Sequence, residues 1–231
     1  MLFSTNNMTN KVQLIGWYGG DKRHALSAWT STFSGNEALT ADELFEKEQA
    51  MRKRGMPQLL AYLAKENHHT PFEKSMLDFR LVVDDATHIH FLKHRIGVPI
   101  NAESARYKEV QDKAYIPYDW PEHLQNELKE LIAKTDKFYH KALEQLTPIL
   151  GRKRAKESAR YAKMKCSQLA LDVAFNFRSF VHFQNLRNVP GVAQDEVCHI
   201  ANEMLRQVVR IPGQPFYHSI EAFGLAERLK G

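Results

Sequence analysis

One segment of this 231-residue chain, residues 68–107, is rich in side chains that can bind an anion. The donors in its second half are His90, Lys93, His94, Arg95, Asn101, Ser104 and Arg106. On a helix, the first three would share a face because they stand three and four positions apart. Lys and Arg form charge-assisted hydrogen bonds with phosphate, and loop N–H groups add further donors. The segment therefore predicts a site for a phosphorylated ligand.

Taken singly, each of these residues is more typical of an ordinary surface or core position. His88, His90 and His94 have no acidic or cysteine residue at a matching spacing, and their faces diverge, so no metal site is predicted. Ser104 lies in no GxSxG elbow, and the residue order implies no His–Asp pair, so no serine nucleophile is predicted. The density of donors is what indicates a binding site.

The charge balance favours anionic partners. Lys and Arg number 32 against 27 Asp and Glu, which gives a net charge of +5. Such an excess suits either nucleic acid or phosphorylated small molecules. The basic clusters at residues 52–54 and 152–154 sit in helical patterns beside acidic residues, which is typical of solvated helix faces. Net charge alone does not decide between the two classes of partner.

Other features indicate the class of protein. The sequence has no run of 18 apolar residues, so no membrane span is expected. Residues 1–10 have neither a basic start nor an apolar stretch typical of a signal peptide. The two cysteines, Cys166 and Cys198, form no CxxC pair and are expected to be reduced. A cytoplasmic protein is predicted, with a polar tail over residues 1–10 and a single catalytic domain over residues 11–231.

The elements that must position the donors follow from hydrophobic periodicity. Alternating apolar residues predict strands over residues 11–18, 74–83 and 168–175. Helical spacing predicts helices over residues 40–66 with a break at 55–57, 85–95, 121–150, 152–164, 177–186 and 194–210. Asp84 and Asp85 suit the cap of the short helix, and residues 96–101 are expected to form a loop. Together these elements predict an α+β fold, with helices packed against a small, mostly antiparallel sheet.

Three short blocks stand in order along the chain. They are HHTPFE at residues 68–73, KHRIGVPINAESARY at residues 93–107, and NFRS at residues 176–179 followed by NLR at residues 185–187. Together they resemble the signature blocks of the flavin-dependent thymidylate synthases. Arg160 stands where that family has an arginine ahead of the third block. The resemblance extends over about residues 11–223, nearly the whole chain.

The chain departs from the family pattern at several positions. Lys93 replaces the first arginine of the second block, which keeps the charge but loses a two-pronged hydrogen bond. The first serine of that signature is absent, and one extra residue precedes its asparagine. Ala102 replaces the usual glutamate, with Glu103 one place later. His182 stands where an asparagine is common, and Val192 where a histidine is common.

The resemblance implies an enzyme that converts dUMP to dTMP. In that family methylene-tetrahydrofolate is the carbon donor, NADPH the reductant and FAD the hydride carrier, and no enzyme nucleophile is used. The protein supplies binding, orientation and electrostatics. Homotetramers with active sites built from several subunits are implied. No nucleic-acid or membrane partner is expected.

The resemblance also assigns roles to individual residues. The flavin-binding residues it implies are Thr70, Glu73, Lys93, His94, Arg95, Asn176, Arg178, His182 and Leu186. The dUMP-binding residues it implies are His90, Glu103, Ser104, Arg106, Arg160 and Arg187. Arg187 would grip the pyrimidine edge and stabilise developing charge, Arg95 would also lie near the nucleotide, and His68 would lie near the flavin ring and the folate.

Helical geometry gives a further expectation for the third block. Arg178, His182 and Asn185 share one face of an ideal helix, whereas Arg187 falls on roughly the opposite side. One helix could thus serve different ligands. The simpler alternative is that Arg187 only caps the helix C-terminus, where cations are favoured.

Three other interpretations compete with this one; the first remains open, and the three ordered blocks count against the other two. One is a catalytically degenerate flavin or nucleotide binder, because several signature positions are altered. Another is a basic nucleic-acid-binding domain, which would bind oligonucleotides with a steep salt dependence and hold no flavin. The third is a structural helical domain whose His and Arg residues are merely surface groups.

Overall fold

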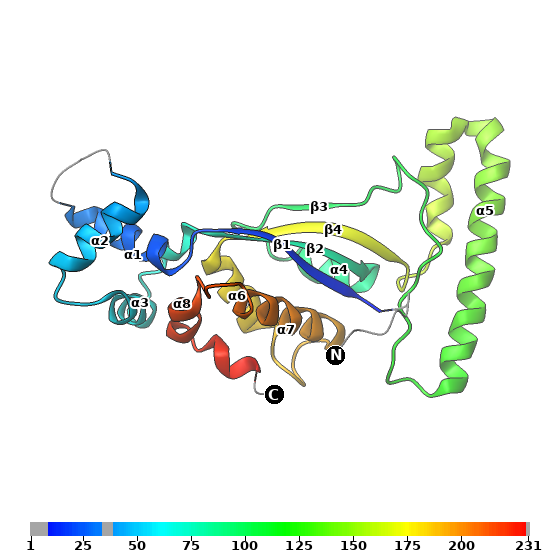
Figure 1. Ribbon diagram of the computed structural model, residues 1–231. Coiled ribbons are helices and arrows are strands. Elements are labelled where there is room, and N and C mark those ends of the chain that lie inside the picture. The colour runs from blue at the N-terminus through cyan, green and yellow to red at the C-terminus, as the bar shows by residue number, and fades with distance from the viewer. Residues whose placement is uncertain (1–8, 34–38, 230–231) are drawn as a thin grey trace. The chain divides into compact units, whose positions relative to one another are not determined.

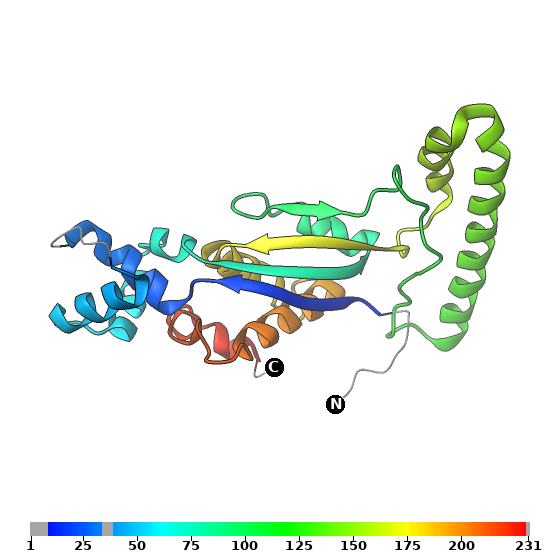
Figure 2. The ribbon, with the colours of Figure 1, turned by 45° about the horizontal axis from the view of Figure 1, so that its top comes forward.

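The computed structural model describes residues 9–33 and 39–229 (Figure 1). Four strands form one sheet in the order β1-β2-β4-β3. The strands are β1 Lys11–Tyr18, β2 Met76–Asp84, β3 Ile100–Ala102 and β4 Gln168–Phe175. Figure 2 shows neighbouring strands pointing in opposite directions, so the sheet is antiparallel. The predicted α+β class, with helices and a small antiparallel sheet, is confirmed.

Eight α-helices account for about half of the described residues. They are α1 Asp21–Trp29, α2 Ala41–Met51, α3 Met56–Lys65, α4 Asp85–Phe91, α5 Glu122–Ala159, α6 Phe177–Arg187, α7 Asp195–Val209 and α8 Tyr217–Ala222. Short 3₁₀ turns, η1 to η4, cover Thr30–Thr32, Thr70–Glu73, Arg160–Ala162 and Leu225–Leu229.

Capping side chains explain where several helices begin. Thr40 and Glu43 form a capping box ahead of α2. The Asp84 carboxylate accepts from the Thr87 N–H at 2.8 Å, as expected for the cap of α4. The Asn176 side chain accepts from the Ser179 N–H at 2.8 Å and begins α6. Local polar chemistry therefore places the start of both helices that border the predicted site.

A left-handed glycine divides α5 into two helices. Gly151 has φ of 76°, a conformation that L side chains rarely adopt, and the chain reverses there (Figure 1). Tyr139 and Leu143 of the first part pack with Ala155 and Ala159 of the second. The two separate helices expected over residues 121–150 and 152–164 are confirmed, although the second ends earlier, at Ala159.

The chain divides into two compact units. The α5 unit contains Met1–Lys11, Leu81–Lys93 and Ile100–Asp172. The α7 unit contains Val12–Arg80, His94–Pro99 and Val173–Gly231. Strands β2 and β4 each run from one unit into the other along the chain.

Aromatic side chains build much of the core of the α7 unit. Phe79 of β2 stacks on Phe180 of α6 with ring centroids 6.0 Å apart, and Phe175 of β4 lies 5.1 Å from Phe183. All four rings are fully buried. Helix α6, which carries the third sequence block, is thus fixed to the sheet by its phenylalanines.

The structure corrects three details of the predicted elements. Helix α4 ends at Phe91 rather than near residue 95. The Lys93 N–H donates to the carbonyl of His90, three residues back, in place of the four-residue spacing of an α-helix. Lys93 and His94 therefore follow the helix, and the predicted helical face with His90 is wrong. Strand β3 begins at Ile100, inside the predicted loop. Helices α1 and α8 were not anticipated.

No helix among the described residues is long and apolar enough to span a membrane. Residues 1–8 of the expected polar tail lie outside the described part of the chain.

Candidate functional site

The residues singled out from the sequence fall into two groups. The α7 unit holds His68, Thr70, Glu73, His94, Arg95, Asn176, Arg178, His182, Leu186 and Arg187. The α5 unit holds His90, Lys93, Glu103, Ser104, Arg106 and Arg160. Apart from Lys93, the residues assigned to the flavin thus belong to one unit. Apart from Arg187, those assigned to dUMP belong to the other.

In the α7 unit, an ion pair joins the first block to the third. Arg178, near the start of α6, donates from Nη1 to Oε1 of Glu73 at 2.6 Å. Both side chains are exposed, so a ligand can reach either of them. The two blocks are 105 positions apart in the sequence, and the fold brings these two residues together.

A second contact joins the second block to the third. Arg187, the last residue of α6, donates from Nε to Nε2 of His94 at 3.1 Å. His94 is buried and packs edge-on against Phe183 at 5.0 Å. Because Nε2 accepts this bond, it carries no proton in this arrangement. Arg187 thus reaches a histidine of the second block and does more than end a helix.

The loop that follows His94 packs against the N-terminus of α6. Ser179 donates its hydroxyl to the Ile96 carbonyl at 2.7 Å, and the Asn176 N–H reaches the Gly97 carbonyl at 3.4 Å. Gly97 has φ of +66°, and a Cβ there would lie 2.3 Å from the Asn176 side-chain nitrogen. Only glycine fits this close approach. The extra loop residue is accommodated with the two blocks in contact.

The remaining predicted residues of this unit lie at the surface. The exposed ones are His68, Thr70, Arg95, His182 and Leu186. The ring of His182 lies 5.9 Å from that of His94. His182 shares a helix with Arg178, so α6 presents basic side chains from its first turn to its last.

The α5 unit contains a cavity of about 720 Å³. Three of the residues assigned to dUMP line it: Glu103, Ser104 and Arg160. His90 and Arg106 are not among its lining residues. Lys108, Lys163 and Lys165 also line this wall, and each of them is paired with a carboxylate.

The sequence reading missed these lysines and also His88, which lines the same cavity. Lys163 and Lys165 lie just ahead of β4. Two basic residues before a predicted strand are the only sequence feature that could have pointed to them. Burial lowers the pKa of His88 below its usual range, and its Nε2 is buried without a hydrogen-bond partner. His88 is therefore a neutral group at this wall.

Glu103 is tied to the sheet. Its backbone N–H donates to the Ala170 carbonyl at 2.9 Å, and its carboxylate accepts from the Ala170 N–H at 3.1 Å. The other carboxylate oxygen pairs with Lys108. The Glu103 side chain therefore holds β4 and Lys108 in place. This structural role differs from the direct contact with dUMP that the resemblance implies.

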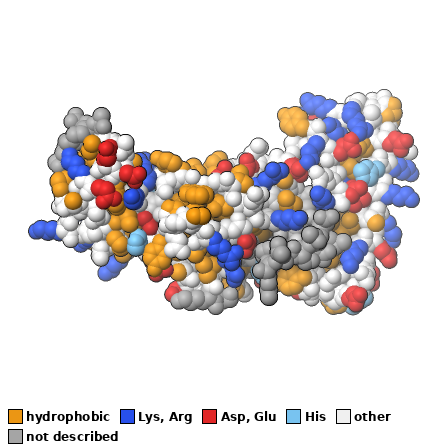
Figure 3. Space-filling view, in the orientation of Figure 1, with side chains coloured by type: hydrophobic (Ala, Val, Ile, Leu, Met, Phe, Trp, Pro, Cys, Tyr) orange, Lys and Arg blue, Asp and Glu red, His pale blue; other side chains and the backbone are white. Residues whose placement is uncertain are grey.

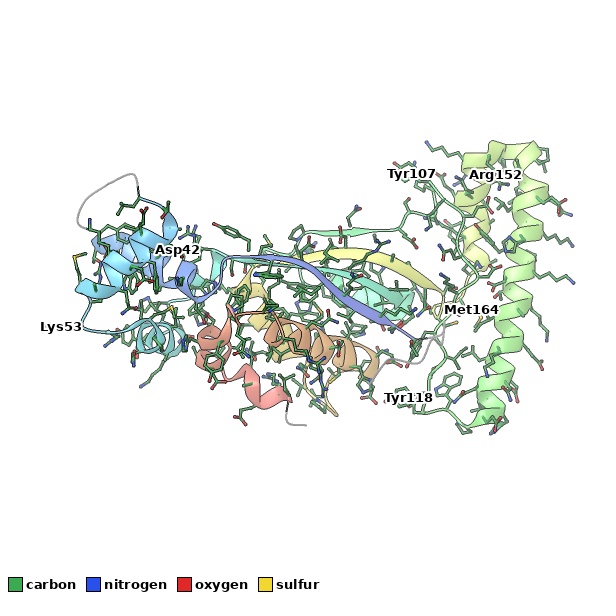
Figure 4. The ribbon with its side chains drawn as sticks, in the orientation of Figure 1. Asp42, Lys53, Tyr107, Tyr118, Arg152 and Met164 are labelled. Carbon is green, nitrogen blue, oxygen red and sulfur yellow. The ribbon has the colours of Figure 1, made fainter. Side chains whose placement is uncertain are left out.

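Arg106 is held by a carboxylate of the second α5 helix. Its Nε donates to Glu157 at 2.7 Å, and this hydrogen bond raises the pKa of Arg106 and lowers that of Glu157. Nearby, Lys156 donates to the Tyr107 carbonyl at 2.7 Å. Figure 4 shows Tyr107 beside the part of α5 that begins at Arg152. The second block is thus pinned along this helix by ionic contacts.

The chain is similar to several known proteins. The family model for thymidylate synthase complementing protein matches residues 13–212. The chain is 28% identical to a flavin-dependent thymidylate synthase of Streptomyces avermitilis over 214 residues, covering 84% of this chain and 83% of that protein. It is 27% identical to the Streptomyces coelicolor protein of the same name, covering 90% and 89%.

Among solved structures, the chain resembles the UMP/dUMP methylase PolB from Streptomyces cacaoi bound with 5-Br UMP. The TM-score is 0.71 with 20% sequence identity, over 97% of this chain and 99% of that one. This likeness bears on the fold alone. With the three blocks joined as described and a family model that matches most of its length, the chain belongs to the thymidylate synthase complementing protein family.

Proposed function

We propose that this chain is a flavin-dependent thymidylate synthase that converts dUMP to dTMP. Methylene-tetrahydrofolate would donate the carbon, and NADPH would reduce FAD. The observation that supports this most is the pair of contacts made by α6. Arg178 reaches Glu73 and Arg187 reaches His94, so that the third block contacts the first block and the His94–Pro99 part of the second within the α7 unit.

The donors of the α7 unit fit an anionic dinucleotide cofactor. Arg178 and His182 stand on exposed turns of α6, and Thr70 and Arg95 are exposed nearby in the sequence blocks. Gly97 lets the loop backbone pack closely on the N-terminus of α6, next to Arg178. These residues, with Asn176 and Leu186, are proposed to hold FAD. Lys93, in the α5 unit, is proposed as a further phosphate partner.

Bound FAD would supply the hydride that completes the methyl group. The chain's own residues bind, orient and stabilise charge. Arg187 has a guanidinium that can hold the pyrimidine edge and stabilise charge developing on its carbonyl. Arg95 and His68 are proposed to line the reacting region. No residue of the chain is proposed as a covalent nucleophile.

The α5 unit is proposed to bind dUMP through Arg160 and Ser104, which line its cavity. Arg106 and His90 are proposed partners from the same sequence block. Charge-assisted bonds from arginine suit a nucleotide monophosphate. On the face drawn in Figure 3, acidic and basic side chains are interspersed over α5, unlike the continuous basic stripe of a nucleic-acid binder.

We further propose that the two units serve one catalytic domain and that the protein works as a homotetramer in the cytoplasm. Sedimentation equilibrium of the purified protein tests the oligomeric state. A monomer that turns over would reject the tetramer while leaving the reaction intact.

An anaerobic turnover assay tests the reaction. Purified protein is given FAD, NADPH, methylene-tetrahydrofolate and dUMP, and dTMP is followed. We expect product that disappears when either FAD or the folate is omitted. Arg206→Ala, an exposed arginine of α7 outside the proposed sites, serves as a control that should turn over normally.

A degenerate binder is the second candidate. Ala102 stands where the family has a glutamate, and Glu103, one place later, is engaged with the Ala170 backbone. Protein that binds FAD and dUMP but forms no dTMP in the same assay would favour this candidate over the enzyme.

A further inference from the structure

His24 is the centre of a buried hydrogen-bonded relay in the α7 unit. Its Nδ1 lies 2.8 Å from the Ser219 hydroxyl, and its Nε2 lies 2.8 Å from the Ser75 hydroxyl. Ser219 Oγ lies 2.6 Å from Asp21 Oδ1. The four side chains come from α1, α8 and the residues ahead of β2, elements far apart in the sequence.

The hydrogen bonds of Asp21 fix the direction of the relay. Its carboxylate also accepts the N–H groups of His218 and Ser219 at 2.7 and 2.9 Å. The Ser219 hydroxyl donates its one proton to this carboxylate, so its oxygen accepts from Nδ1–H of His24. Nε2 of His24 is then an acceptor, and the Ser75 hydroxyl donates to it. His24 is locked in a single neutral tautomer.

The surroundings keep His24 neutral. The residue is fully buried, with the rings of Phe72, Phe177 and Phe216 at centroid distances of 5.1, 5.4 and 6.1 Å. Burial lowers the pKa of His24 to about 3. An imidazole in such a site is costly to leave without its hydrogen bonds.

The relay ends on the segment that carries the first signature block. Ser75 follows η2, whose residues include Thr70 and Glu73. The ring of Phe72, in η2, packs against His24 and also against Phe223, whose ring centroid lies 4.8 Å away. Ser75 is only 3% exposed, so its hydroxyl is shielded from any ligand. The relay therefore fixes orientation and transfers nothing to a substrate.

We propose that His24 is a positioning residue, which fixes residues 70–75 through Ser75 and so places Thr70 and Glu73 for the flavin. The inference rests on the proposed function, since flavin is the ligand assigned to those two residues. It assigns a role to a histidine that lies outside all three signature blocks.

The two ring nitrogens of His24 can be tested separately. His24→Asn keeps a donor near the position of Nδ1 but removes the acceptor for Ser75, whereas His24→Gln can keep that acceptor. Ser75→Ala removes the same bond from the other side. Val208→Ala, a core truncation on α7, is the control for general loss of stability. It lies outside the proposed binding machinery.

Two readouts are needed for each variant. One is the dissociation constant of FAD, and the other is amide hydrogen exchange of peptides covering residues 68–75 in flavin-free protein. We expect His24→Asn and Ser75→Ala each to weaken FAD binding about tenfold and to speed exchange in that segment. The double variant should be no worse than either single one. His24→Gln should restore most of the affinity.

Three results would overturn the positioning role. They are unchanged exchange in residues 68–75, FAD affinity equal to wild type despite faster exchange, or an equal loss of affinity in Val208→Ala at the same melting temperature. A wild-type protein that binds no FAD would instead overturn the proposed function, and the exchange data would still report whether His24 fixes the segment.

Discussion

The exposed ion pairs of the α5 unit contrast with the buried His24 relay of the α7 unit. In the α5 unit, Arg106 and Lys108 are paired with carboxylates at positions that remain open to water. In the α7 unit, His24 and Ser219 are fully buried and bonded in one direction. Exposed ion pairs contribute about 0–1 kcal/mol and exchange partners readily, whereas buried hydrogen bonds are costly to break. A ligand can therefore recruit the charges of these α5 pairs, as it can those of Arg178 and Glu73 in the α7 unit, whereas the His24 relay is a fixed, buried frame.

Arg187→Ala should have the largest effect. Loss of a charge positioned for the transition state typically costs about a hundredfold or more in turnover. The variant also leaves the buried His94 without its partner. Steady-state kinetics check this, with Arg206→Ala, an exposed arginine of α7, as the control. Turnover within threefold of wild type would show that Arg187 serves only the helix end.

Arg106→Ala should affect the nucleotide and spare the flavin. We expect the dissociation constant of dUMP to rise about thirtyfold, because a charge-assisted bond to phosphate is lost. Isothermal titration with dUMP and with FAD measures both affinities. Equal losses for the two ligands would remove the distinction drawn between the units.

Arg178→Ala should give the reverse pattern. The exposed guanidinium on α6 would no longer reach a flavin phosphate, and Glu73 would lose its cation. FAD affinity should fall about tenfold with dUMP affinity unchanged. Fluorescence titration of FAD provides the measurement, and a weaker affinity for dUMP alone would assign α6 to the nucleotide instead.

The buried imidazole predicts a pH dependence of stability. The folded-state pKa of His24 is about 3, below its ordinary value of 6.5. The neutral ring therefore stabilises the folded state above pH 6.5, and this contribution is lost as the pH falls from 6.5 towards 3. Between these two pKa values, the contribution of His24 to the free energy of unfolding falls by about 1.4 kcal/mol for each pH unit.

His24→Gln does not titrate in this range, so it is the matched comparison. Burial raises the pKa of Asp21, which acts in the opposite direction at low pH, but Asp21, Arg23 and His218 are common to both proteins. Urea unfolding between pH 6.5 and 4.5 should show a steeper decline for wild type. Parallel curves would mean that His24 titrates normally.

Ser104→Ala should have the smallest effect. The hydroxyl lines the cavity and is proposed to bind dUMP without forming a covalent bond. We expect less than a threefold change in turnover, in line with the loss of one neutral hydrogen bond. Complete loss of turnover in a folded variant would instead support Ser104 as a covalent nucleophile.

Sequence periodicity predicted β1, β2 and β4, whose apolar residues alternate along the strand, and missed the three-residue β3. In β2 the alternating apolar residues are all fully buried, so the sequence pattern matches the buried face of the strand. They are Leu77, Phe79, Leu81 and Val83. Helix α1 was missed because Gly20 gives it no capping side chain and its apolar face is short. The fold class therefore followed from local pattern, while the helices without such signals did not.

The candidate site was predictable only in part. The short blocks gave the identities of Arg178, Arg187 and His94, but not which residue each would contact. Pairs such as Arg187 and His94 are 93 positions apart, and no local pattern encodes that approach. His24 gave no signal at all, because a lone histidine in sequence is indistinguishable from a surface one.

The glycine that reverses α5 makes that turn a practical attachment point. Gly151 is exposed with open space around its Cα, and it is flanked by the exposed Ile149 and Leu150. Exposed helix-to-helix tips of this kind tolerate inserted peptides. An affinity tag or a pair of fluorescent labels inserted there would immobilise or report on the protein without altering any residue assigned to either ligand.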